Sequence, residues 1–234
     1  MKMIKVLKQV GLMTKENRSP EFASKVAKEY WAKCDKTHGD TSSEAFEIYY
    51  KNILKIMEPT ADDIILDAGC GGGELTYLFH KDGFNVKGFD SSEHLISMAK
   101  AKFGCDLFYV DDLVNMIDKN GGFTKIFLNN CFFYVHPEYY NIVLKNLYDI
   151  TYDNGAVYLF DDPDYSKRNR WYKRYFPNVL SFFLPIYDPY MAGFWVKTKY
   201  LKRVALDVGF SKVLKIDSWA YYRSHHVLFK EEDV

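Results

Sequence analysis

The chain has 234 residues, of which 48% are hydrophobic and 18% aromatic, so it is long enough for one domain with a sizeable core. Its 31 lysines and arginines equal its 31 aspartates and glutamates, and this zero net charge disfavours a nucleic-acid partner, because such binding relies on a basic field. No apolar run approaches the roughly 20 residues of a membrane span, and the first residues lack the apolar stretch of a signal peptide, so we expect no membrane partner.

The four cysteines, Cys34, Cys70, Cys105 and Cys131, lie far apart and form no C-x-x-C pair. This spacing predicts neither a disulfide framework nor a structural metal site, and it favours a reducing cytoplasm. Cys70 and Cys131 follow predicted strands, where we interpret them as small buried apolar side chains and not as nucleophiles.

Two helices are predicted before the first strand. The first enters at Ser19-Pro20-Glu21, with serine as cap and proline in the first turn. The second follows the capping box Thr41-Ser42-Ser43-Glu44, and Pro59 ends it. Residues 1–60 are therefore expected to form an N-terminal helical cap.

From Ile64 onward, predicted strands and helices alternate. Strands are expected at 64–67, 85–90, 106–110, 125–129 and 156–160, the last one entered through a turn at Asn154-Gly155. Helices are expected at about 73–82, from Ser91 or Ser92, and at about 137–151. This alternation predicts a parallel sheet with helices on both faces.

The segment from 161 to 197 is too long for an ordinary connection, and its length predicts a functional lid. Thr198 is expected to cap a helix at 199–208. Two strands at about 211–217 and 220–229 follow with a short connection, which predicts an antiparallel pair.

A glycine cluster directly follows the first predicted strand, in the run Asp67-Ala68-Gly69-Cys70-Gly71-Gly72-Gly73-Glu74. Such a turn lets backbone approach a ligand, because glycine has no Cβ and tolerates positive φ. A dinucleotide fingerprint needs glycine where Glu74 stands, and no Lys-Ser or Lys-Thr follows to make a P-loop. Acidic Asp67 and Glu74 favour a cationic or amine-bearing ligand over a phosphate.

The positions Asp67, Gly69, Gly71 and Gly73 resemble motif I of the class I S-adenosylmethionine-dependent methyltransferases. The resemblance covers about residues 60–230. It implies an α/β fold with a Rossmann-like doubly wound seven-stranded sheet, the last strand antiparallel, N-terminal helices, and a lid insert between strands five and six. It further implies a single methyltransferase domain over 1–234, with a cap (1–60), a cofactor-binding core (61–160), a substrate lid (161–197), and a C-terminal helix and strand pair (198–234).

The resemblance implies S-adenosylmethionine as cofactor and S-adenosylhomocysteine as product. Asp90 ends the second strand, where a carboxylate can accept hydrogen bonds from both ribose hydroxyls; the alternative is an aspartate that stabilises a helix N-terminus. Asp111 is expected to bond the adenine amino group and Asp112 to supply a backbone amide, with a shift of one residue left open. The implied cofactor site comprises Tyr30, Asp67, Gly69, Cys70, Gly71, Asp90, Ser91, Asp111, Asp112, Asn129 and Asn130, with core packing as the alternative role of Tyr30.

The segment from Asn129 to Pro137 resembles the stretch after strand four in small-molecule methyltransferases, which often carries a histidine pair. Here Tyr134-Val135 occupies the place of that pair, and His136 stands one position later. We treat His136 and Tyr134 as candidate catalytic residues, since imidazole titrates in the range that suits proton removal. As a lone histidine before a proline, His136 could instead be a helix cap.

The predicted lid interleaves basic and aromatic side chains, a combination that can hold a phosphate, a carboxylate or a sugar ring. The alternative is the solvated face of a helix. The candidate substrate-binding residues are Arg168, Arg170, Trp171, Arg174 and Tyr175.

The sequence therefore indicates a methyltransferase acting on an oxygen or nitrogen of a small soluble acceptor, such as an anionic metabolite or a nucleotide-linked sugar. Two alternatives stay open: a catalytically silent S-adenosylmethionine-binding partner protein, and an NAD-dependent oxidoreductase. A nucleic-acid methyltransferase is disfavoured, because Asn130-Cys131-Phe132-Phe133 lacks both prolines of the N/D-P-P-Y type motif. We expect a cytoplasmic monomer or homodimer.

Overall fold

The computed structural model describes residues 20, 25, 29, 31, 43–104, 106–117, 122–175, 187–188 and 193–231. Pro20, Lys25, Glu29 and Trp31 are helical, whereas the rest of the predicted first helix, Tyr30 included, lies outside the described residues. No helix in the described part of the chain is long and apolar enough to cross a bilayer.

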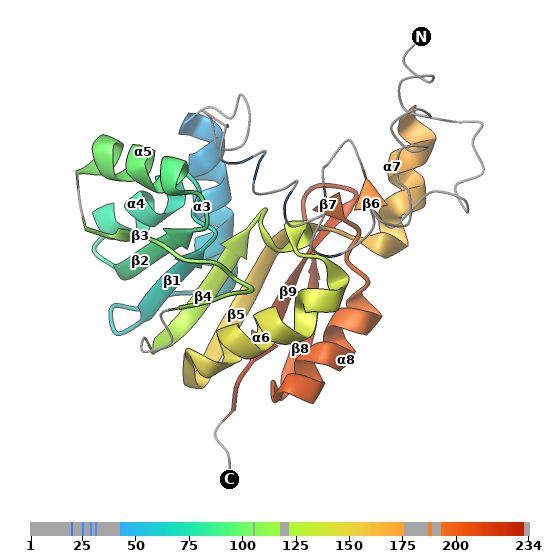
Figure 1. Ribbon diagram of the computed structural model, residues 1–234. Coiled ribbons are helices and arrows are strands. Elements are labelled where there is room, and N and C mark those ends of the chain that lie inside the picture. Colours follow the sequence, from blue (N-terminus) through green and yellow to red (C-terminus); the bar gives the residue numbers. More distant parts are fainter. Residues whose placement is uncertain are drawn as a thin grey trace.

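The described core is built on a seven-stranded sheet in the order β3-β2-β1-β4-β5-β9-β8 (Figure 1). In this sheet β9 runs antiparallel to the other six strands, so the predicted Rossmann-like sheet with an antiparallel last strand is confirmed. The strands are β1 (Ile64–Ala68), β2 (Asn85–Asp90), β3 (Phe108–Val110), β4 (Phe123–Asn129), β5 (Thr151–Pro163), β8 (Lys212–Asp217) and β9 (Arg223–Phe229).

Helices cover both faces of this sheet (Figure 1). Neighbouring residues of one strand point to opposite faces, so Ile65 packs with α3 and α4, whereas Leu66 packs with α6 and α8. The helices are α3 (Ser43–Met57), α4 (Glu74–Lys81), α5 (Glu93–Phe103), α6 (Tyr140–Asp149), α7 (Arg168–Tyr175) and α8 (Thr198–Val208). Shorter elements are η2 (Phe132–Tyr134), η3 (Pro137–Tyr139), η4 (Tyr165–Lys167), and the strand pair β6 (Tyr187–Asp188) and β7 (Gly193–Phe194).

Strand β5 is longer than predicted at both ends. It begins at Thr151, and Asn154 lies inside it with φ 62°, where the register to β4 shifts. The predicted turn at Asn154-Gly155 is therefore wrong, because asparagine tolerates this φ and forms a bulge in a continuous strand. The strand also continues past Phe160, through a second register shift at which Asp161 has φ 58°.

Several predicted boundaries are corrected in the same way. Thr198 does not cap α8: Lys197 is the N-cap residue, and Thr198 Oγ1 instead lies 3.0 Å from His226 Nε2. Strand β9 begins at Arg223 and not at 220, and β3 begins at Phe108 and not at 106. The helix expected from 137 is divided into η3 and α6.

Candidate functional site

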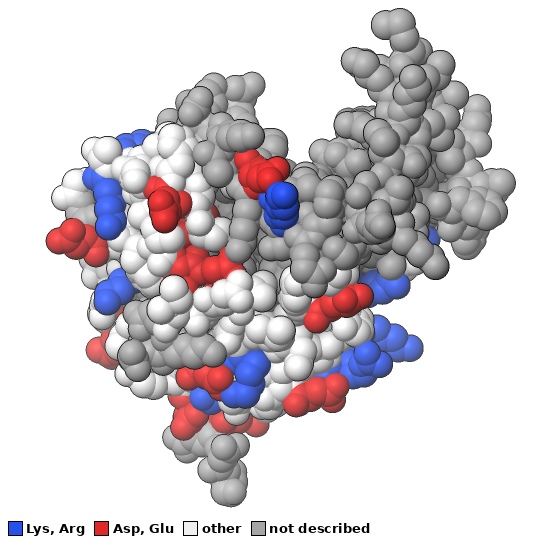
Figure 2. Space-filling model, viewed as in Figure 1, with Lys and Arg blue, Asp and Glu red and all other residues white. Residues whose placement is uncertain are grey.

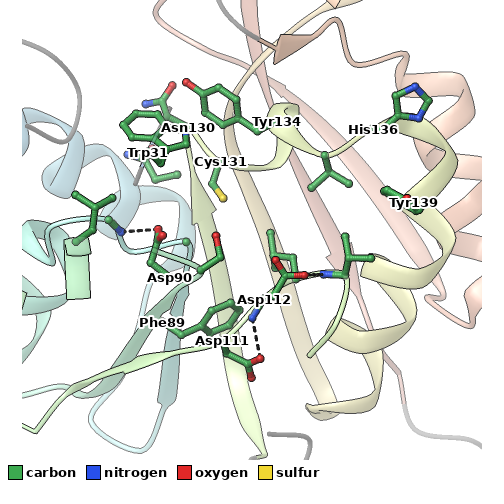
Figure 3. Close-up of a pocket in the computed structure, with 18 residues that line it drawn as sticks. Trp31, Phe89, Asp90, Asp111, Asp112, Asn130, Cys131, Tyr134, His136 and Tyr139 are labelled. Carbon is green, nitrogen blue, oxygen red and sulfur yellow. Dashed lines mark hydrogen bonds between the residues drawn. The ribbon is translucent and has the colours of Figure 1, made fainter. Parts of the chain in front are cut away.

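A cavity of about 130 Å³ lies at the carboxyl ends of β1, β2 and β4 (Figure 3), the edge at which open parallel sheets bind ligands. Asp67 and Cys70, which the resemblance assigned to the cofactor, do not line it. The predicted residues that do line it are Gly69, Gly71, Asp90, Ser91, Asp111, Asp112, Asn129, Asn130, Tyr134 and His136.

The loop after β1 is a backbone turn that requires glycine. The amides of Gly69 and Cys70 both donate to Phe89 O at 2.8 Å, which fastens the loop to the end of β2. Gly69 has φ +85°, and a Cβ there would lie 2.2 Å from Cys131 Sγ. Gly73, with φ 82°, is the N-cap of α4. The turn therefore brings unobstructed backbone to the cavity.

Asp67 lies beneath this loop, and Thr76 Oγ1 donates to its Oδ2 at 2.7 Å. Burial, together with the nearby charge of Asp90, raises the pKa of Asp67 to about 7, although the hydrogen bond from Thr76 lowers it. This residue therefore supports the loop from below and titrates near neutrality, where it can respond to a cation bound above it.

Replacing Asp67 by Asn should remove a pH dependence of stability. The folded protein holds a proton on Asp67 between pKa 3.8 in the unfolded chain and about 7, so its free energy of unfolding falls as pH rises through this window. Relative to wild type, the variant should gain a few kcal/mol between about pH 4 and about pH 8, measured by urea unfolding. Equal slopes for the two proteins would contradict the assigned ionisation.

Asp90 closes the other side of the loop. Its Oδ2 accepts from the Gly71 amide at 3.0 Å and its Oδ1 from the Ser92 amide at 2.9 Å, and Ser92 caps α5. Burial raises the pKa of Asp90, while the hydrogen bonds from Ser92 and Gly71 lower it. Asp90 thus organises the loop and the start of α5 and still faces the cavity.

Asp111 and Asp112 follow β3 and shape the next wall of the cavity (Figure 3). Asp111 Oδ1 accepts from the amides of Asp112 and Ile117 at 2.7 and 3.0 Å. Asp112 Oδ1 accepts from the amides of Val114 and Asn115 at 3.0 and 2.8 Å. The Asp112 amide that the resemblance assigned to an adenine nitrogen is therefore already bonded to Asp111 in this structure, and a ligand would have to exchange that bond.

Asn129 supplies the observation that best tests whether a ligand fits here. It is buried at the end of β4 and lines the cavity, and its Nδ2 has no hydrogen-bond partner among the described residues. A buried amide group without a partner is costly, so an acceptor atom of a bound molecule would satisfy it. Together with the three aspartates on the walls, this donor fits a ligand that carries both cationic and acceptor groups.

Tyr134 and His136 stand at different places in the cavity (Figure 3). The ring of Tyr134 meets that of Trp31 edge to face, with centroids 5.5 Å apart. His136 Nδ1 accepts from the Glu138 amide at 3.2 Å and caps η3, and its ring packs on Phe194. His136 therefore has the capping role that the sequence left open, in addition to lining the cavity.

The cysteines near the loop are not activated. Burial raises the pKa of both Cys70 and Cys131 well above the usual value, so both thiols stay neutral. Across the described residues, no group of three or more His, Cys, Asp or Glu side chains could hold a metal ion.

Of the predicted lid residues, Arg168, Arg170 and Trp171 do not line this cavity. Arg168 stacks on Tyr165 at 4.1 Å, Arg170 is exposed, and Trp171 packs on Tyr222 with ring centroids 4.3 Å apart. Arg174 and Tyr175 belong to α7, but their side chains lie outside the described residues. On the face in Figure 2, the Lys and Arg side chains of described residues are interspersed with Asp and Glu and form no continuous basic patch.

Sequence reasoning missed most of the apolar wall. Trp31 stands next to the predicted Tyr30, but the other residues carry no signal besides their hydrophobicity. The missed lining residues are Trp31, Phe89, Leu95, Leu113, Val114, Cys131, Val135 and Tyr139.

Comparisons with known proteins agree with this geometry. Residues 65–155 match a family model described as a methyltransferase domain. A protein of Geobacillus sp. (strain WCH70) that carries the provisional name of a methyltransferase is 26% identical over 137 residues, which are 56% of this chain and 54% of that protein. The chain thus spans about half the length of this curated relative.

Two solved structures share the fold. A TehB-like S-adenosylmethionine-dependent methyltransferase from Corynebacterium glutamicum superposes with a TM-score of 0.57 at 20% identity, over 81% of this chain and 98% of that one. Magnesium protoporphyrin IX methyltransferase from Synechocystis PCC 6803, solved with S-adenosylmethionine bound, gives 0.61 at 14% identity, over 89% and 97%.

The sheet order, the glycine loop and these matches agree with one another. Residues 65–155 match a methyltransferase domain, and the described core has the fold of solved S-adenosylmethionine-dependent methyltransferases, as the motif at Asp67 to Gly73 predicted.

Proposed function

We propose that this protein transfers a methyl group from S-adenosylmethionine to an oxygen or nitrogen of a small acceptor. The observation that carries the proposal is that two cavities share lining residues. The cavity described above shares Trp31, Asn130 and Tyr134 with a second cavity of about 490 Å³. A cofactor in the first and an acceptor in the second would meet at these three residues.

The first cavity suits the proposed cofactor. Asp90 would bind the ribose hydroxyls, Asp111 the adenine, and the Gly69 loop with Asn129 the amino-acid end. Asp67 beneath the loop and the aspartates on the walls favour a cationic ligand electrostatically. S-adenosylmethionine brings an already activated methyl group, so the residues of this chain need mainly to align the acceptor with it and exclude water.

Within this proposal, Tyr134 is better placed than His136 to orient the acceptor, because it alone of the two lines both cavities. Its hydroxyl can hold the O–H or N–H of an acceptor in line with the methyl group. His136 already accepts a backbone hydrogen bond through Nδ1. We therefore assign acceptor orientation to Tyr134 and keep His136 as the second candidate for proton removal.

Replacing Tyr134 by Phe should lower kcat about tenfold, because the ring stays and only the orienting hydroxyl is lost. The Kd for S-adenosylhomocysteine should change less than about twofold, since the apolar contacts of the ring remain. His136→Asn tests the second candidate and should lower kcat less than Tyr134→Phe does. Release of S-adenosylhomocysteine measures all three proteins, and a selective loss in the His136 variant would move the role to that residue.

The two alternative functions, an NAD-dependent oxidoreductase and a catalytically silent cofactor-binding partner, differ from a methyltransferase in what they predict. An NAD-dependent oxidoreductase would place a pyrophosphate beside Glu74 and the three cavity aspartates, which is electrostatically unfavourable. A silent cofactor-binding partner would bind S-adenosylmethionine but never release S-adenosylhomocysteine with any acceptor. Screening a panel of small acceptors for this product separates it from an enzyme.

The remaining features of the proposal rest on the sequence. We propose one methyltransferase domain with residues 161–197 as its lid, in which Trp171 supports the wall of the second cavity through Tyr222. An anionic metabolite or nucleotide-linked sugar is the proposed acceptor. We also propose a monomer or homodimer in the cytoplasm with no nucleic-acid partner, consistent with the zero net charge.

A further inference from the structure

The second cavity has walls made mainly of aromatic rings from four separate parts of the chain. They come from the N-terminal helix (Trp31), from α3 (Tyr49), from the segment after β4, and from the loop between β8 and β9. The aromatic lining residues are Trp31, Tyr49, Phe133, Tyr134, Trp219, Tyr221 and Tyr222. The Trp219 side chain, which lines this cavity, is 65% exposed. Large aromatic side chains that stay exposed together beside a cavity are typical of a binding site.

One cation, Arg223, stands among these rings at the start of β9. Its guanidinium lies 5.3 Å from the ring centre of Phe133 and 5.0 Å from that of Tyr222. Its Nη1 donates to Asn130 Oδ1 and to the main-chain oxygen of Asp161. No carboxylate of the described residues forms an ion pair with it.

Two neighbouring carboxylates form no ion pair with Arg223. Asp161 also lines the cavity, but its Oδ1 accepts from Ser218 Oγ at 2.5 Å and lies 3.8 Å from His225 Nδ1, and the Asp161 amide donates to the same nitrogen. Asp162 is buried, and burial raises its pKa against the charge of Arg223. Arg223 therefore uses one nitrogen to hold backbone and amide oxygens, and the rest of its planar fork has no acceptor among the described residues.

Two residues beside Arg223 have left-handed backbone. Asn130 has φ 53° and Asp161 has φ 58°, a conformation that asparagine and aspartate adopt more readily than other residues with a side chain. Both stand at the carboxyl ends of neighbouring strands, and Arg223 bonds to both. This arrangement fixes the guanidinium between the two strand ends, beside the junction with the first cavity.

We infer that the second cavity binds a flat aromatic acceptor that carries an anionic group, with Arg223 as its anchor. This inference rests on the proposed function and specifies its substrate class. A guanidinium fork that forms no ion pair with a carboxylate of the described residues can bind a carboxylate or a similar anion in two parallel hydrogen bonds. Aromatic walls select a flat ring. A cationic acceptor is disfavoured because the faces of Phe133 and Tyr222 already meet the protein's own cation.

The test uses three probes that share one ring system and differ in charge: 2-naphthoate, 2-naphthamide and 2-naphthylmethylamine. Binding to the full chain is measured by calorimetry with S-adenosylhomocysteine at saturation. The anion should bind at least about tenfold more tightly than the neutral amide, as a charged hydrogen bond allows, and the amine should bind most weakly. Equal affinities in the wild-type protein would overturn the inference without any variant.

Variants then locate the anchor. Arg223→Gln should abolish the preference for the anion over the amide, and Arg223→Lys should keep part of it. Arg203→Gln is the matched control, because it removes an exposed guanidinium from α8 that lines neither cavity. Arg170→Gln on α7 tests the predicted lid helix as the competing place of the anchor. A purely structural role for Arg223 would weaken the anion and the amide equally, and this result would contradict the inference.

The outcome also separates this inference from the proposed function. Loss of the preference in the Arg170 variant would place the anchor in the lid and overturn the assignment of Arg223. Binding of S-adenosylhomocysteine with no preference among the probes would leave the methyltransferase standing and refute the substrate class. Failure to bind S-adenosylhomocysteine would refute the proposed function itself.

Discussion

Replacing Asp90 by Ala is expected to weaken the binding of S-adenosylhomocysteine by about a hundredfold or more. The carboxylate holds the Gly71 and Ser92 amides at 3.0 and 2.9 Å while it faces the cavity. Its loss removes the proposed acceptors of the ribose hydroxyls and also releases the glycine loop. Two hydrogen bonds to a charged group, at about 1.5–3 kcal/mol each, account for this magnitude. Calorimetric titration measures it directly.

Glu93→Gln is the matched control for the Asp90 variant. Glu93 is an exposed acid in the first turn of α5, three positions away, and it does not line the cavity. Its loss should change the affinity by less than about twofold, because long-range electrostatics at an exposed site are screened by salt. Affinity within about threefold of wild type in the Asp90 variant would contradict the assigned role.

Replacing Gly69 by Ala is expected to destabilise the protein by about 3 kcal/mol, through positive φ and a steric clash together. Gly69 has φ +85°, and the added Cβ would lie 2.2 Å from Cys131 Sγ and 3.0 Å from its Cβ. Gly83 provides a close comparison, since it has φ +88° with nothing within 4 Å of an added Cβ. Gly83→Ala should therefore cost only the conformational part, about 1 kcal/mol. Urea unfolding measures both variants.

The steric part can be isolated with a double mutant. Cys131→Ala removes the sulfur that a Cβ at Gly69 would meet, so Gly69→Ala should cost less in that background than in wild type. Strictly additive free energies, or equal costs at Gly69 and Gly83, would show that the loop does not pack against Cys131 as described.

The sheet could be predicted from sequence because its strands are short apolar runs that end at glycine or at a polar residue. The errors in the bounds of β5 arose where asparagine or aspartate, both typical of turns, lies inside the strand. Asn154-Gly155 has the composition of a turn, but β4 pairs with β5 on both sides of it, at Thr151 and from Ala156, so the two residues form a bulge within one strand. Pairing with β9 carries β5 beyond Phe160, and no local pattern at Asp161 predicts the bulge there.

The polar residues of the first cavity could be predicted, whereas most of its apolar wall and the second cavity could not. Asp90, Asp111 and Asn129 each stand at a strand end, and the carboxyl ends of parallel strands share one edge, so a rule about topology finds them. Arg223 and Tyr49 come from β9 and α3, which are distant in sequence and carry no motif. Their convergence depends on the packing of the whole domain, which periodicity does not encode.

Thermal unfolding of the full chain with either S-adenosylhomocysteine or NAD tests the central claim most directly. A ligand at about 100 times its Kd adds roughly 2.7 kcal/mol to the free energy of unfolding. For a chain of this size, that gain raises Tm by several degrees. We predict this shift with S-adenosylhomocysteine, its disappearance in the Asp90→Ala variant, and no shift with NAD. A shift with NAD alone, or with neither compound, would contradict a cofactor site for S-adenosylmethionine.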